Sequence, residues 1–305
     1  MVQYHPEHPP ATQSNLAERP SFLSHEIFPF QSKWMDVNGQ RIHYIDEGKG
    51  TALVFFHGNP TYSFLFRKVI PLLRHRFRCI AFDYPGFGLS QATADYNFLP
   101  EEHAAISDAF LRKLKLKKWI PAVSDWGGPI GLRVAQLQQD RVPALIIGNT
   151  FAWPVNGDFH FEGFSRFFGG FLGKILIRHF HAFVRVLIPA GTRRVKLTES
   201  EMKAYLRPMA TPDARMPTYI FPRSILKSKN FLTKVEEHLS ALKNRRTLLL
   251  WGDRDIAFRA KEREQFQKAL PNSRAKILSG AGHFIWEDSP EEIASEILKF
   301  SDSLG

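Results

Sequence analysis

Eight short apolar runs, separated from the third run onward by stretches of helical periodicity, limit what this 305-residue chain can fold into. Asn38-Gly39, between the first two runs, is typical of a two-residue hairpin turn. Alternation of strands with helices, here over 61–73, 100–114 and 129–137, is typical of a parallel sheet covered on both faces. We therefore expect an α/β fold with a mostly parallel eight-stranded sheet, its strands at 34–37, 41–46, 52–57, 79–83, 119–123, 144–149, 247–251 and 275–278.

The alternation stops between Thr150 and about Phe231. This stretch has helical periodicity, carries nine of the chain's 27 phenylalanines by Phe183, and includes Thr198-Glu-Ser-Glu201, which is typical of a capping box. We interpret it as a helical cap inserted into the α/β core. The expected organisation is an N-terminal arm at 1–27, a first core part at 28–150, the cap at 151–224 and a second core part at 225–305.

Cysteine usage and the N-terminus exclude several classes of protein. Cys79 is the only cysteine, so no intramolecular disulfide can form, and its apolar run indicates a buried thiol. No Cys/His spacing resembles a zinc site, and we expect neither metal nor cofactor. The N-terminus lacks the basic and apolar regions of a secretory signal, and no apolar run reaches the roughly 18 residues of a membrane span. We expect a soluble, cytoplasmic protein.

The net charge of +11 is concentrated in one segment, since residues 151–230 hold 13 basic and 5 acidic residues. Such a field favours anionic partners. One hypothesis is a peripheral module for anionic membranes, because basic residues alternate with Phe and Ile as in an interfacial helix; a solvated basic face over a hydrophobic cap explains the same pattern. No nucleic-acid-binding motif is present. The basic residues concerned are Lys174, Arg178, Arg185, Arg193, Arg194 and Lys196.

The segment Ala122-Val-Ser-Asp-Trp-Gly-Gly128 ends a strand and opens a helix, as a nucleophile elbow does. Such a turn needs a small residue two positions after the nucleophile. Asp125 has Gly127 at that position, whereas Ser124 would have Trp126. We therefore predict that Asp125 is the nucleophile, which excludes serine esterase chemistry and indicates attack on an sp³ carbon through a covalent alkyl ester. An aspartate that only caps the next helix is the structural alternative.

Partners for this nucleophile follow in the order acid, then histidine. His283, in Gly280-Ala-Gly-His-Phe284, is predicted as the general base. Asp255, after the seventh strand, is predicted to orient the histidine and stabilise its imidazolium form. Asp253 is the competing acid, but it lies nearer the strand end and suits the turn better.

Two hydrogen-bond donors are expected beside the nucleophile. Asn59, in the segment Phe55-Phe-His-Gly-Asn-Pro60, and Trp126 can together form an oxyanion hole with their backbone N–H groups. The Asn59 side-chain amide and the Trp126 indole N–H are further neutral donors, which suit a departing anion. The structural alternative is that Asn59 only shapes a turn and Trp126 only packs.

These residues resemble the motifs of the haloalkane dehalogenases of the α/β-hydrolase superfamily, from about residue 28 to the C-terminus. The resemblance implies that Asp125 is the nucleophile and His283 the base, with Asn59 and Trp126 as the halide-binding pair. One subgroup takes its acid from a glutamate after the sixth strand; Asn149 occupies that position here, which favours Asp255. The matching segments are His57–Pro60, Asp83–Ser90, Asp125–Gly128, Trp251–Asp255 and Gly282-His283.

The same resemblance leaves the reaction open. Hydrolysis of a haloalkane would give alcohol, halide ion and a proton. Segments 148–154 and 220–223 also resemble relatives that decarboxylate β-lactones in long-chain olefin synthesis, with the same fold and nucleophile. Epoxide hydrolysis ranks third: Tyr205 and Tyr219 could supply the O–H donors it needs, but Asn59 is atypical for it.

The expected substrate is small and apolar, and an aromatic cap suits an apolar pocket. The alternative is that the phenylalanines form the core of the cap itself. Relatives in this subgroup often associate, so a homo-oligomer is expected by resemblance. The residues predicted to line the pocket are Phe151, Trp153, Phe164, Phe168 and Phe284.

Overall fold

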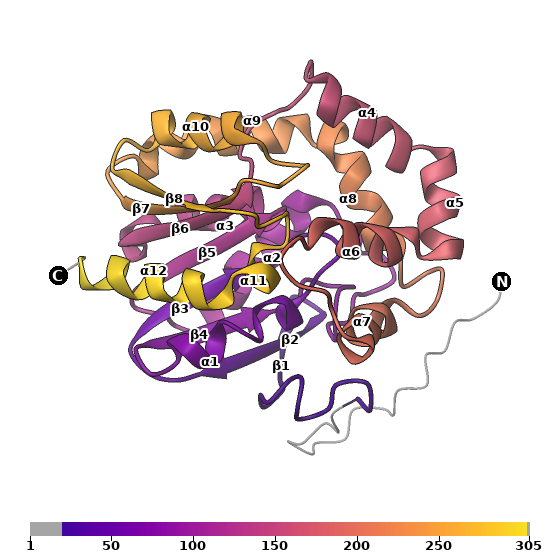
Figure 1. Ribbon diagram of the computed structural model, residues 1–305, viewed down its shortest axis with the longest axis horizontal. Coiled ribbons are helices and arrows are strands. Elements are labelled where there is room, and N and C mark those ends of the chain that lie inside the picture. The colour runs from indigo at the N-terminus through magenta and orange to yellow at the C-terminus, as the bar shows by residue number, and fades with distance from the viewer. Residues whose placement is uncertain (1–19, 304–305) are drawn as a thin grey trace.

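One eight-stranded sheet with helices on both faces organises the molecule, for which a computed structural model describes residues 20–303 (Figure 1). The strand order is β1-β2-β4-β3-β5-β6-β7-β8, and only the β1–β2 and β2–β4 pairs are antiparallel. The expected α/β class and mostly parallel sheet are therefore confirmed. The strands are β1 Lys33–Val37, β2 Gln40–Glu47, β3 Thr51–Phe56, β4 Phe77–Phe82, β5 Trp119–Asp125, β6 Ala144–Thr150, β7 Arg246–Gly252 and β8 Ser273–Leu278.

The central strands are buried on both faces, as the continuous apolar runs in the sequence require. Side chains alternate across a strand, so neighbours along β3 enter different halves of the core. Val54 and Phe56 pack in the cluster under α2 Pro100–Lys113 and α3 Gly127–Leu137. Leu53 and Phe55 pack in the cluster under α12 Pro290–Asp302 on the opposite face.

The prediction of a single helix over 61–73 is wrong in detail. This segment forms two short pieces, the 3₁₀ turn η1 Ser63–Phe66 and the helix α1 Ile70–Leu73. Pro71 explains the break, since proline lacks the N–H that a continuous helix would use and fits only near a helix start. The remaining core elements are η2 Gln139–Arg141, α9 Lys229–Glu237, η5 His238–Leu242, α10 Ala260–Ala269 and α11 Ile285–Asp288.

Between β6 and β7 a set of helices lies beside the sheet (Figure 1). Thr198 starts one of them as expected, because its hydroxyl oxygen accepts from the Glu201 N–H at 3.2 Å while Glu201 accepts from the Thr198 N–H at 2.9 Å. The expected cap end at residue 224 falls inside the last helix. The cap helices are α4 Phe159–Phe168, α5 Phe171–Phe180, the π-helical turn η3 Phe183–Leu187, α6 Ile188–Gly191, α7 Glu199–Leu206, η4 Arg207–Met209 and α8 Met216–Lys227.

Most of the expected N-terminal arm, residues 1–19, lies outside the described residues. Leu23 is already buried in the core cluster that also contains Phe28 and Phe30, so the chain packs on the core ahead of residue 28. Cys79 is buried, as expected. Within residues 20–303, no helix combines the length and the apolar character needed to cross a lipid bilayer.

Candidate active site

Asp125 occupies a strained turn between β5 and α3. Its φ angle is +50°, a value that non-glycine residues adopt rarely and mostly at functional turns. The Thr150 hydroxyl, at the end of the neighbouring strand β6, donates to the Asp125 carbonyl oxygen at 2.5 Å and holds the turn. The turn therefore lifts the carboxylate out of the sheet at the carboxyl end of a central parallel strand.

Glycines on both sides make room for this turn. A Cβ atom on Gly127 would lie 2.1 Å from the Phe56 carbonyl oxygen, so no larger residue fits two positions after Asp125. A Cβ atom on Gly58 would lie 2.3 Å from the Asp125 side chain itself. The turn therefore requires glycine two positions after the residue at its tip. The sequence meets this requirement for Asp125, which is followed by Gly127, but not for Ser124.

The Asp125 carboxylate faces two backbone donors. The Asn59 N–H donates to Oδ1 at 2.7 Å, and the Trp126 N–H also donates to the carboxylate. Burial raises the pKa of Asp125, against the opposing effect of His283 and these two N–H groups. The two donors lie where an oxyanion formed at the Asp125 carboxyl carbon would be stabilised.

His283 lies between two carboxylates. Its Nε2 atom is 3.6 Å from Asp125 Oδ2, and its Nδ1 atom is 3.1 Å from Asp255 Oδ2. Burial alone would lower the pKa of His283, but the two carboxylates outweigh it and raise that pKa to about 9. Asp255 also accepts from the Ala257 N–H at 2.6 Å, which fixes its carboxylate beside the ring.

The structure places the competing residues away from the histidine ring. Asp253 accepts from the Gly280 N–H at 2.6 Å and so holds the turn before the histidine. Asn149, in the position that could have carried an acid, donates to the Gly282 carbonyl oxygen at 2.9 Å and accepts from the Gly252 N–H at 3.0 Å. Both residues hold loops around His283 rather than contacting its imidazole.

The side chains of Asn59 and Trp126 border the same cavity as Asp125. Asn59 Nδ2 donates one hydrogen to the Thr218 carbonyl oxygen at 3.1 Å, which leaves its second hydrogen for another acceptor. The Trp126 ring packs between Phe151 and Phe221, at centroid distances of 5.1 and 5.2 Å. This packing fixes the plane of the indole and hence the direction of its N–H.

The cavity has a volume of about 240 Å³ and an almost entirely apolar wall. Of the five residues predicted to line it, Phe151, Phe164 and Phe284 do so. Two predictions are wrong. Trp153 turns away and packs against Phe266 at a centroid distance of 4.8 Å, and Phe168 packs behind Phe164 at 4.8 Å, inside the core of the cap.

Several lining residues were missed from the sequence. Phe183 and Leu187 enter the cavity from η3, and their inward direction depends on how the cap packs. Ile256 and Phe258 follow Asp255 closely in the sequence. Their position as apolar residues beside the predicted acid was the signal that could have placed them in the cavity wall. The remaining apolar wall residues missed are Pro60, Phe161, Gly191, Pro222, Ile225 and Ala257.

The two tyrosines considered as donors for epoxide opening lie elsewhere. The Tyr205 hydroxyl donates to Glu287 Oε1 at 2.6 Å in the protein interior. The Tyr219 hydroxyl donates to the Gly169 carbonyl oxygen at 3.0 Å. Within the described part of the chain, no tyrosine lines the cavity, so this requirement of epoxide hydrolysis is not met.

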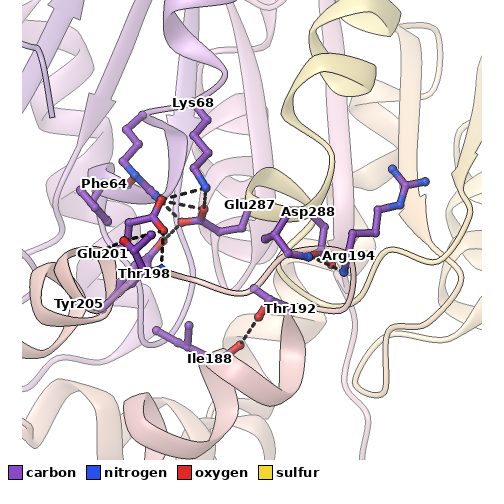
Figure 2. Close-up of polar contacts among 12 residues, drawn as sticks. Phe64, Lys68, Ile188, Thr192, Arg194, Thr198, Glu201, Tyr205, Glu287 and Asp288 are labelled. Carbon is purple, nitrogen blue, oxygen red and sulfur yellow. Dashed lines mark hydrogen bonds and ion pairs between the residues drawn. The ribbon is translucent and has the colours of Figure 1, made fainter. Parts of the chain in front are cut away.

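Helix α11, directly after the histidine loop, fastens the cap to the core (Figure 2). Glu287 is buried and accepts from Arg67 Nη2 at 3.0 Å and from Lys68 Nζ at 3.1 Å. Glu201, from α7 of the cap, also pairs with Arg67 and lies 3.0 Å from Lys68 Nζ. Two cations and two anions thus neutralise one another at the junction, and they hold the cap beside the active site.

Asp288 makes a second junction. One of its oxygens accepts from the Gly282 N–H at 2.7 Å, in the peptide next to His283. The carboxylate also accepts from the backbone N–H groups of Arg193 and Arg194, at 2.9 and 3.0 Å, in the cap segment drawn in Figure 2. The position of the loop that carries His283 is thereby coupled to the position of the cap.

Comparison with known families agrees with this geometry. A family model described as the alpha/beta hydrolase fold matches residues 51–290. Haloalkane dehalogenase 2 of Mycobacterium tuberculosis is 37% identical over 276 residues, which cover 90% of this chain and 96% of that protein. The match therefore covers nine-tenths of this chain and nearly the whole of that protein.

Two other proteins, one compared by sequence and one by structure, are also similar to this chain. The cis-3-alkyl-4-alkyloxetan-2-one decarboxylase of Shewanella oneidensis is 29% identical over 289 residues, covering 90% of this chain and 89% of that protein. The crystal structure of a haloalkane dehalogenase from Bradyrhizobium elkani superposes with a TM-score of 0.83 at 26% identity, covering 90% of this chain and 98% of that one.

Proposed function

The chain belongs to the haloalkane dehalogenase family of α/β hydrolases, and we propose that it hydrolyses carbon–halogen bonds through an alkyl ester on Asp125. The observation that carries the proposal is a carboxylate, rather than a hydroxyl, at the elbow. It lies at the base of an apolar cavity and within 3.6 Å of a carboxylate-bound histidine. A carboxylate nucleophile in an apolar cavity suits attack on an alkyl carbon.

In the first step an oxygen of Asp125 forms a bond to the alkyl carbon while the carbon–halogen bond breaks. The halide leaves with the bonding electron pair. Asn59 and Trp126 line the cavity, and their side-chain N–H groups are the donors that we propose for this anion. The apolar wall lowers the local polarity, and this strengthens both hydrogen bonds to the developing charge.

In the second step a water molecule attacks the ester carbonyl carbon of Asp125. His283 Nε2 removes one proton from that water, and the resulting oxyanion lies against the backbone N–H groups of Asn59 and Trp126. Collapse of the intermediate breaks the ester bond, and the alcohol leaves with the second proton of the water. His283 ends this step protonated, as in the starting enzyme, so the net proton of the reaction is the one that the imidazolium gives to solvent after Asp125 is alkylated.

The electrostatics of the site favour this order of steps. Asp255 and Asp125 together hold the pKa of His283 at about 9, so the imidazole carries a proton at neutral pH before substrate reacts. Alkylation of Asp125 removes one of the two negative charges. The pKa of His283 then falls, because only the Asp255 carboxylate still favours the imidazolium. Alkylation of Asp125 therefore shifts His283 toward the neutral imidazole that acts as the base, although Asp255, the stronger of the two carboxylate effects, still favours the imidazolium.

Decarboxylation of a β-lactone is the second candidate, favoured by the similarity to the Shewanella enzyme over nine-tenths of this chain. Asp125 would attack the sp³ ring carbon that is bonded to the ring oxygen. The bond between that carbon and the ring oxygen would break, and this would leave a free carboxylate. Loss of that carboxylate as carbon dioxide would form the alkene and release Asp125. No water is consumed, so the histidine would not act as a hydrolytic base.

Product analysis separates the two reactions. Purified enzyme is incubated with brominated and iodinated alkanes of several lengths, and in parallel with a cis-disubstituted β-lactone. Asp125→Ala serves as the control for both. We expect halide release that is absent in Asp125→Ala. Halide release at background from folded protein, together with carbon dioxide and alkene from the lactone, would contradict dehalogenation and establish the second candidate.

A further inference from the structure

Helix α5 exposes apolar side chains to solvent along its length. Phe171, Leu172 and Phe180 are 80%, 54% and 64% exposed, whereas Ile177 on the other side of the helix is fully buried. A helix on a protein surface normally turns a polar face outward. α5 is apolar on both sides, and its polar residues, Lys174, Arg178 and His179, are all basic.

Neighbouring cap elements also expose apolar side chains. Phe159 on α4 is 87% exposed, and Phe167 at the end of α4 and Val186 in η3 are exposed as well. α4 and α5 pack against each other at the outer edge of the cap (Figure 1). We call the set the apolar patch: Phe159, Phe167, Phe171, Leu172, Phe180 and Val186.

The charges around the apolar patch are positive. Glu162 is the only acidic residue within 159–187, and it is paired with Arg166. Arg178 is paired with Asp213. Lys174 and Arg185, in contrast, have no acidic partner among residues 20–303. Arg185 is exposed, and the half-buried Lys174 has its ammonium 5.8 Å from the centroid of the Tyr219 ring, so two cations without an acidic partner belong to the elements that carry the patch.

The cavity opens beside this patch. His160 and Ile256 both line the cavity and are exposed, so the cavity reaches the surface between α4 and the loop after β7. α4 and η3 each contribute to both surfaces: Phe164 and Leu187 line the cavity, while Phe159 and Val186 of the same elements face solvent.

We propose that the apolar patch docks on an anionic lipid surface, with its aromatic side chains in the boundary between headgroups and acyl chains. Lys174 and Arg185 would lie among the headgroups, as basic residues do at the polar edge of interfacial helices. α5, a helix of ten residues, is far too short to span a bilayer and would lie along the interface.

A second copy of the chain fits this surface less well. In a two-fold dimer the same patch faces itself, so Lys174 and Arg185 would meet positive charge without an acidic partner. An anionic lipid surface supplies the missing charge. Arg194, included in the sequence-based hypothesis, has no place in this contact, because it is paired with Glu292 and bound to the Ser279 carbonyl oxygen.

Vesicle sedimentation tests the proposal without reference to the reaction that the site performs. The full chain is mixed with vesicles of phosphatidylcholine alone, or of equal parts phosphatidylcholine and phosphatidylglycerol, at low and high salt. We expect stronger binding to the mixed vesicles, weakened by salt. The double variant Phe171→Ser, Leu172→Ser should bind at least about tenfold more weakly, because two large apolar side chains no longer enter the lipid.

Two further variants sharpen the result. Lys174→Glu should lower binding to mixed vesicles by about fivefold or more and leave binding to neutral vesicles unchanged. Leu137→Ser removes an apolar side chain of similar exposure, 46%, on α3 outside the patch, and should bind as the wild type does. Matching circular dichroism and unfolding midpoints establish that the variants are folded.

Three outcomes would overturn the proposal: no binding of the wild type to either vesicle, equal binding by the wild type and the double variant, or a stable oligomer in solution that the double variant converts to a monomer. The last outcome would assign the patch to a second copy of the chain.

Discussion

The Nε2 atom of His283 lies 3.6 Å from Oδ2 of Asp125, so the imidazole and the carboxylate are neighbours without a direct hydrogen bond. The other ring nitrogen, Nδ1, lies 3.1 Å from Asp255 Oδ2, and this contact keeps Nε2 directed at Asp125. A substrate carbon, and later a water molecule, can therefore approach Asp125 without breaking a bond between the two residues.

Asp255→Asn should slow hydrolysis of the ester strongly. An amide at this position offers N–H to His283 Nδ1 and favours the wrong tautomer, a change that costs about 10⁴ in rate in a comparable triad. Single-turnover kinetics with a bromoalkane would show the ester accumulating. Asp253→Asn is the matched control, because Asp253 binds the Gly280 N–H and not the ring. Equal loss in both variants would contradict the assignment of the acid.

Trp126→Phe should slow halide departure while leaving the oxyanion hole in place. The variant keeps an aromatic ring between Phe151 and Phe221 and keeps the backbone N–H, but it loses the indole donor. Loss of one such donor costs about 10²–10³ in rate. Rapid-quench measurement of the halide burst tests the first step separately. Trp153→Phe, outside the cavity, should leave the burst unchanged; a slower second step with a normal burst in Trp126→Phe would refute the role.

The free energy of unfolding should fall as pH rises through the pKa of His283. This pKa is about 9 in the folded protein and about 6.5 in the unfolded chain, so the folded state binds the proton more tightly. The stabilisation is complete below pH 6.5 and is lost by about pH 9, with an upper limit of roughly 3 kcal/mol. Urea titrations of the wild type and His283→Phe at both ends of this range test it. The same pH dependence in both proteins would show that the histidine is not responsible.

Asp288→Ala should affect stability and catalysis together. Without this carboxylate the Gly282 N–H is left buried and unpaired, at a cost of about 1–3 kcal/mol. The peptide next to His283 also loses its anchor, so ester hydrolysis should slow. Chemical denaturation and single-turnover kinetics measure the two effects. A variant with reduced stability but normal hydrolysis would limit Asp288 to a structural role.

The sheet could be predicted from the sequence because its signal is local. Each buried parallel strand is a short apolar run, and Gly127 marks the turn after Asp125 independently of the rest of the fold. The chain order of nucleophile, acid and histidine then predicts Asp255 and His283 as its partners. The prediction of one helix over 61–73 was wrong, because Pro71 prevents a continuous helix even though the apolar pattern favours one.

The cavity wall could not be predicted to the same extent, because it depends on how separate elements pack. Phe164 and Phe168 lie one turn apart on α4, yet only Phe164 lines the cavity, since Phe168 fills the space against Phe183. In the sequence, the basic and apolar residues that begin at Lys174 resemble one interfacial helix. His181 instead adopts a φ of +56° and ends α5, so the basic and apolar residues beyond it point in new directions.

The central claim is that Asp125 carries the alkyl group between the two steps. Mass spectrometry of His283→Phe, after incubation with a bromoalkane that the wild type hydrolyses, tests it directly. We expect one added alkyl mass in His283→Phe, located by proteolysis on the peptide that contains Asp125. The Asp125→Ala, His283→Phe double variant should not gain this mass. Unmodified His283→Phe protein with that substrate, or an alkyl group on any other residue, would contradict the account.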